Sequence, residues 1–206
     1  MEMAHLVGFD AEGSVRLAAF LLRWRVIAVP LRPAALPGEG AGLVLLNAGA
    51  RELAWTLVGA MADPEPGARV IALFPVQAFP VWDAGLFPRW VRCVAFDRLE
   101  EVLRQEYGPP AGTPPRPHAA LWAPDDGLVQ VVAAEVAGPA GAVLRAPLEP
   151  RPGGRGWVVL RRGPARVRLA GTVGARRPAA AGWRVVVRFA EVTPPVLERL
   201  VEIVAA

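Results

Sequence analysis

Few side chains in this sequence are suited to chemistry at neutral pH. Among its 206 residues are one cysteine (Cys93), two histidines (His5 and His118) and one serine (Ser14). Two histidines and one cysteine cannot form the ligand cluster of a zinc site. Ser14 opens a helical pattern, where a serine usually caps the helix rather than acting as a nucleophile. We expect no metal, no cofactor and no catalytic residue, and predict that the protein is not an enzyme.

The phosphate-binding and nucleophile motifs of common enzymes are missing as well. No G-x-G-x-x-G follows the first apolar run, and neither G-x-x-x-x-G-K-[ST] nor G-x-S-x-G occurs. This excludes the usual phosphate-cradling loops and the hydrolase nucleophile elbow.

The basic residues are all arginines and are unevenly distributed. Up to Gly108 there are 10 arginines against 12 acidic residues, and the remainder has 13 against 7. The C-terminal part is therefore able to attract anions. No apolar run is long enough to span a membrane, and the first ten residues lack the layout of a secretory signal. We predict a cytoplasmic protein without membrane insertion.

Proline and glycine divide the chain into two domains. The segment GPPAGTPPRP, residues 108–117, follows the last helical pattern and has the composition of a linker. We predict an α/β domain over 1–107 and a β domain over 118–206.

The first domain alternates apolar runs with amphipathic stretches, which is typical of a parallel sheet covered by helices. One helix should begin near Ser14, with Val15, Ala18, Ala19 and Leu22 on its apolar face. Another should begin at a capping box of Asp97 and Glu100 and end at Gly108. The remaining predicted elements are a helix over Arg51–Met61 and strands at His5–Phe9, Val26–Val29, Leu43–Leu46, Val70–Phe74 and Val91–Phe96.

The second domain has short β-rich runs separated by glycine and proline, which favours a small antiparallel barrel. A terminal helix should follow, with Thr193 as its cap and Pro194 at its first position. The predicted strands are Leu128–Val136, Ala142–Ala146, Gly156–Arg161, Arg166–Val173 and Trp183–Phe189.

The order of elements in the first domain, with the motifs HLVGFD, LVLLN, VIALFP and FDRLEEVL, resembles a response-regulator receiver. The resemblance implies a flavodoxin-like fold and places the phosphoacceptor position at Asn47, whose amide cannot form an acyl phosphate. Only Asp10 stands for the acidic pair that holds magnesium, Phe74 occupies the hydroxyl position, and the chain has no lysine. The resemblance therefore implies a pseudo-receiver without phosphotransfer. A flavodoxin-like domain of other descent is the alternative.

The second domain resembles a PilZ domain, on GWRVVVRFAEVTPPVLERLVEIV and EVAGPAGAVLRAPLEPRPGGRGWVVL. Many PilZ domains bind cyclic di-GMP through R-x-x-x-R ahead of the barrel and [DN]-x-S-x-x-G in a turn. The segment ahead of the barrel, 114–127, has only Arg116. In the turn Glu135 and Ala137, or in another register Val136 and Gly138, replace the motif residues, which leaves only Gly141. Arg145, Arg184 and Arg188 are the remaining candidate ligand-binding residues, and Arg184 and Arg188 should share one strand face.

Three functions follow from these observations. The leading hypothesis is a bacterial regulatory adaptor that acts through protein–protein contacts, with Trp82, Phe87 and Trp90 as candidate partner contacts or, equally, as core residues. The second is a cyclic di-GMP effector that uses displaced arginines. The third is a nucleic-acid-binding protein, suggested by the basic C-terminal half.

Limited proteolysis tests the predicted linker. An arginine-specific protease should cut first at Arg116, because a Pro/Gly-rich backbone forms no ladder hydrogen bonds that protect it. Mass spectrometry of the fragments identifies the site. First cuts inside 26–96, with Arg116 resistant, would contradict the domain boundary.

Overall fold

The computed structural model describes residues 2–31, 42–49, 58, 69–75, 87–111, 118–190 and 192–205. The chain forms two compact units, and each is built from two segments. Unit 1 contains Met1–Asp10 and Trp24–Pro110, and unit 2 contains Ala11–Arg23 and Ala111–Ala206. The change of unit after Pro110 lies inside the predicted linker. The helical segment Ala11–Arg23 groups with the β unit, which differs from the predicted boundary.

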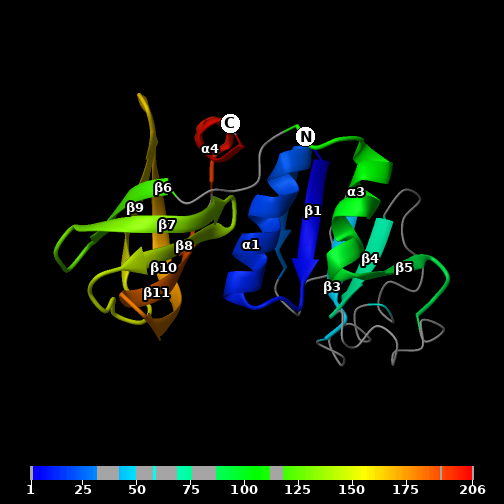
Figure 1. Cartoon of the computed structure of the whole chain (residues 1–206), viewed down its shortest axis with the longest axis horizontal. Coiled ribbons are helices and arrows are strands. Elements are labelled where there is room, and N and C mark those ends of the chain that lie inside the picture. Colours follow the sequence, from blue (N-terminus) through cyan, green and yellow to red (C-terminus); the bar gives the residue numbers. More distant parts are fainter. Residues whose placement is uncertain are drawn as a thin grey trace. The chain divides into compact units, whose positions relative to one another are not determined.

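Unit 1 is a five-stranded parallel sheet in the order β2-β1-β3-β4-β5, which is the flavodoxin-like order (Figure 1). The central strands β3 and β4 are apolar and buried along almost their whole length, as expected where both faces of a parallel sheet are covered. The predicted α/β fold is confirmed. The strands are β1 (Glu2–Val7), β2 (Val26–Pro30), β3 (Leu43–Asn47), β4 (Arg69–Phe74) and β5 (Val91–Ala95).

Helix α3 (Leu99–Tyr107) follows β5 after a short 3-10 turn, η3 (Phe96–Arg98). The predicted capping box is wrong, because Arg98 is the N-cap and no side chain caps the helix. Asp97 lies in the 3-10 turn instead. Gly108 ends the helix as predicted, with a φ of 77° and its N–H donated to the Arg104 carbonyl. The helix predicted over 51–61 lies outside the described residues except Val58, which is helical and buried.

Unit 2 is a closed six-stranded antiparallel barrel with a C-terminal helix, α4 (Pro194–Ala205), as predicted (Figure 1). Side chains that alternate inward fill the barrel, and Leu200 and Ile203 of α4 join them. Across the described residues, no helix is both long enough and apolar enough to cross a bilayer. The strands are β6 (His118–Pro124), β7 (Gln130–Gly138), β8 (Gly141–Ala146), β9 (Arg155–Arg162), β10 (Ala165–Ala179) and β11 (Gly182–Phe189).

Strand β6 was not predicted from the sequence, and it completes the barrel. It pairs with β7 on one side and with β9 on the other, so the barrel cannot close without it. Its sequence, HAALWAP, is rich in alanine and ends in proline, which gives a weak strand signal. The segment ahead of the barrel therefore ends before His118 rather than at residue 127.

Helix α1 (Ala11–Leu21) packs on the outside of the barrel within unit 2. Val15 and Ala19 contact an apolar patch of Val136, Val143 and Val186 from three adjacent strands. Gly138 allows the close approach, because a Cβ atom there would lie 2.9 Å from the Ala19 nitrogen and 3.0 Å from its Cα. The predicted apolar face of this helix (Val15, Ala18, Ala19 and Leu22) is buried.

Substitution of Gly138 tests the packing of α1. Gly138→Val should lower the free energy of unfolding by about 1–3 kcal/mol, because the new methyl groups overlap the helix backbone. Urea denaturation followed by circular dichroism measures the change. Ala133→Val, at an exposed position of the same strand, is the control and should change stability by less than about 0.5 kcal/mol. Equal midpoints for both variants would contradict the packing of α1 against Gly138.

Candidate functional site

The first candidate site is the carboxyl edge of the sheet in unit 1, where doubly wound folds bind ligands. The strand order reverses between β1 and β3, and Asn47 ends β3 at this point. Its amide nitrogen donates to the Gly8 carbonyl at 3.0 Å, and its amide oxygen accepts from the Gly49 N–H at 3.0 Å. Asn47 therefore links the two segments that follow strands β1 and β3.

Aromatic side chains occupy the other strand ends. Phe9, after β1, meets Phe96, after β5, edge to face with ring centroids 6.1 Å apart. Phe74, at the end of β4, is fully buried and packs against Phe87 at 5.7 Å. These groups stabilise the edge of the sheet through apolar contact, and they supply neither a magnesium ligand nor a hydroxyl.

The three aromatic residues predicted as core or partner contacts have different positions. Phe87 is buried, with 6% of its surface exposed, so it is part of the core and not of an exposed contact surface. Trp90 is half-buried and packs against the same cluster. Trp82 lies outside the described residues.

The second candidate site is a cluster of two carboxylates and four guanidinium groups on unit 2. Glu135 of β7 accepts from Arg145 at 2.6 Å, from Arg184 at 2.6 Å and from Arg16 of α1 at 3.2 Å. Glu12 of α1 binds Arg16 at 2.9 Å, Arg184 at 3.0 Å and Arg177 at 3.3 Å. The two glutamates thus join the helix to strands β7, β8, β10 and β11.

This cluster determines which of the candidate ligand-binding arginines already have an internal ion pair. Arg145 and Arg184 are neutralised by internal carboxylates, whereas Arg188 is exposed and has no ion pair with any described residue. Arg184 and Arg188 are on the outer side of β11, but Val186 between them lies under α1. An anion bound by both arginines would therefore have to span a side chain that α1 covers. Sequence reasoning missed Glu12 and took Glu135 only as a motif mismatch, although Glu12 and Arg16 have the spacing of a helical ion pair.

The turn between β7 and β8 lies against α1. A Cβ atom at Gly141 would be 2.9 Å from a Val15 methyl group, and one at Gly138 would meet the backbone of Ala19. The turn between β7 and β8 is therefore covered by a helix of the same unit.

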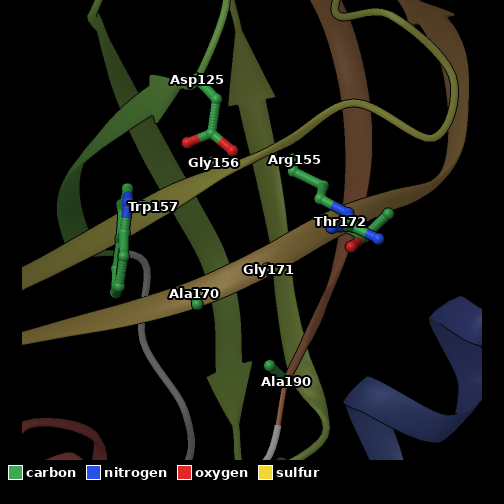
Figure 2. Close-up of a pocket in the computed structure, with 8 residues that line it drawn as sticks. All are labelled: Asp125, Arg155, Gly156, Trp157, Ala170, Gly171, Thr172 and Ala190. Atoms are coloured by element: carbon green, nitrogen blue, oxygen red, sulfur yellow. The ribbon is translucent and has the colours of Figure 1, made fainter.

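A hollow of about 350 Å³ lies along β9 and β10. Figure 2 shows Arg155 and Thr172 on one side of it and Trp157 on the other. Asp125 also lines it, but no ion pair joins Asp125 to Arg155. Side chains that line the hollow can form hydrogen bonds and apolar contacts with a bound group, but none of them is an activated nucleophile.

The perturbed titratable groups do not form a catalytic site. Burial raises the pKa of the Cys93 thiol, which keeps it protonated and unreactive. Burial lowers the pKa of His5, so the imidazole is neutral at pH 7. Burial and a hydrogen bond with Glu2 raise the pKa of Tyr107. Within the described residues no three His, Cys, Asp or Glu side chains group as metal ligands.

No protein-family model matches the chain, and no characterised protein matches its sequence. The receiver and PilZ resemblances therefore rest on the quoted motifs and on the order of elements.

Glu135 is the residue whose loss should most weaken the cluster. Glu135→Gln should lower the free energy of unfolding by about 1–3 kcal/mol, because three guanidinium groups lose a carboxylate whose side chain is only 15% exposed. Urea denaturation at low and high salt measures the loss. Glu101→Gln, which breaks an exposed pair with Arg98, is the control and should cost less than about 1 kcal/mol. Similar losses for both variants would contradict a special role for Glu135.

Proposed function

We propose that the protein is a non-catalytic regulatory adaptor of the bacterial cytoplasm, which acts through contacts with other proteins. One observation carries the proposal: Asn47 and Glu135, at the two positions where the resembled families do their chemistry, both bind internal partners. The sheet and the barrel then serve as scaffolds whose exposed surfaces are available to partners.

The absence of phosphotransfer chemistry is inferred from the carboxyl edge of the sheet. An acyl phosphate needs a carboxylate nucleophile and cations that neutralise the charge developing on the phosphoryl group. Asn47 supplies an amide, and the neighbouring strand ends supply phenyl rings. This combination supports a structural role for the edge.

The cyclic di-GMP alternative requires arginines that are free to bind phosphate. Arg145 and Arg184 would have to exchange Glu135 and Glu12 for the ligand, and α1 would have to leave the turn between β7 and β8. Each charge-assisted hydrogen bond contributes roughly 1.5–3 kcal/mol, so the exchange cancels most of the gain. We therefore favour the adaptor.

Two ligand experiments test the proposal. Acetyl phosphate with magnesium should leave the intact mass unchanged for the wild type and for Asn47→Asp, because the variant still has phenyl rings at the strand ends. Cyclic di-GMP should bind with a dissociation constant above about 1 mM in calorimetric titration, since several charge-assisted bonds are lost.

Either a stable phospho-adduct or a dissociation constant below about 10 μM would contradict the adaptor. In the second case, Arg184→Ala and Arg188→Ala identify the displaced arginines, with the exposed Arg199→Ala as the control. In vivo cross-linking in the host should yield a protein partner that survives nuclease treatment. Recovery of nucleic acid alone would favour the nucleic-acid alternative.

A further inference from the structure

Four strands of the barrel carry a row of outward-facing side chains in register, which are exposed except for the half-buried Val159. Val131 of β7 lies opposite Leu121 of β6, Leu121 lies opposite Val159 of β9, and Val159 lies opposite Arg168 of β10. Val131 is 75% exposed and Leu121 is 40% exposed. Directly beside this row, Arg161 of β9 lies opposite Arg166 of β10. We name these six residues the arginine face.

The three arginines of this face have no acidic partner among the described residues. Arg161 reaches only the Gly163 carbonyl of its own hairpin turn, and Arg168 lies over the ring of Trp157 at 3.9 Å. Like charges placed opposite each other on neighbouring strands destabilise a sheet. The pair of Arg161 and Arg166 is thus unfavourable for the barrel alone, and a negatively charged partner would relieve it.

Elsewhere on the barrel strands and loops, the described arginines other than Arg188 are neutralised. Arg145 and Arg184 bind Glu135, Arg151 binds Asp126 at 2.5 Å, and Arg176 binds Glu149. Arg155, at the far end of the same two strands, again has no described ion pair. The uncompensated positive charge of the barrel is therefore concentrated on the hairpin of β9 and β10.

The side chains of the arginine face indicate which kind of partner it fits. Single-stranded nucleic acid is held by arginines together with several aromatic platforms. Among the described residues beside this face, Trp157 is the one such ring, and the Arg168 guanidinium already covers it. The apolar row of Val131, Leu121 and Val159 instead suits aliphatic side chains of a protein. Because the barrel is closed, a partner binds on its face and not at a strand edge.

We propose that the arginine face binds an acidic segment of a protein partner, which places apolar side chains on Leu121 and Val131 and carboxylates on Arg161, Arg166 and Arg168. The hollow beside Trp157, two residues along β9 from Val159, offers a place for an anchoring side chain. This inference rests on the adaptor function, because it names the chemistry of the partner.

Selection from a random library of 16-residue peptides against the full chain tests the inference, with a 20-nucleotide oligo-dT as the nucleic-acid probe. The selected peptides should be rich in Asp, Glu and aliphatic residues, and their affinity should fall with salt. Fluorescence anisotropy then measures their binding to single variants.

Arg166→Glu is the decisive variant. It places a carboxylate opposite Arg161, so the melting temperature should stay the same or rise, while the selected peptides should bind at least about tenfold more weakly. Arg199→Glu makes the same change of charge at an exposed position of α4, and binding should change by less than about twofold. Leu121→Thr with Val131→Thr should weaken binding while the barrel remains folded.

Three results would overturn the inference: no enrichment of acidic peptides, equal binding by Arg166→Glu and the wild type, or tighter binding of the oligo-dT than of any peptide. The last result would assign the face to nucleic acid. None of these results depends on phosphorylation or cyclic di-GMP, so the inference can fail while the adaptor function stands.

Discussion

The interaction on which unit 2 depends is the packing of α1 against three strands of the barrel. Apolar contact of Val15 and Ala19 with Val136, Val143 and Val186 supplies the attraction, and Gly138 permits the short distance. Around this contact Glu12 and Glu135 bind four arginines. The helix thereby covers the turn between β7 and β8.

In unit 1 the polar group at the end of β3 is also bound internally. The side-chain amide of Asn47 donates to the Gly8 carbonyl and accepts from the Gly49 N–H, which links the segments that follow β1 and β3. Phenyl rings fill the neighbouring strand ends. The described arginines without an ion pair are most numerous on the hairpin of β9 and β10, which is why we propose that a partner binds that side of the barrel.

Much of this fold could be predicted from the sequence, because buried parallel strands are continuous apolar runs. LVLLN and VIALF could be assigned directly as strands. The apolar spacing of α4 predicted a face of Leu197, Leu200, Val201 and Val204, of which all but the half-buried Val201 are buried. Strand β6 was not predicted because its sequence is rich in alanine and proline, which are uncommon in strands. The apolar face of α1 was recognised, but periodicity shows only that a face is buried and not which surface covers it. For the same reason the Glu135 cluster could not be foreseen, since its members come from five separate elements.

The division of each unit between two segments affects how the chain is made. Helix α1 is synthesised about a hundred residues before the first barrel strand, and the patch it covers is complete only after β11 has been synthesised. During that interval Val15 and Ala19 lack the strands that bury them in the finished protein. Unit 2 is therefore not encoded by one continuous segment of the chain. A gene fusion that contains only residues 111–206 would produce a barrel whose apolar patch is uncovered.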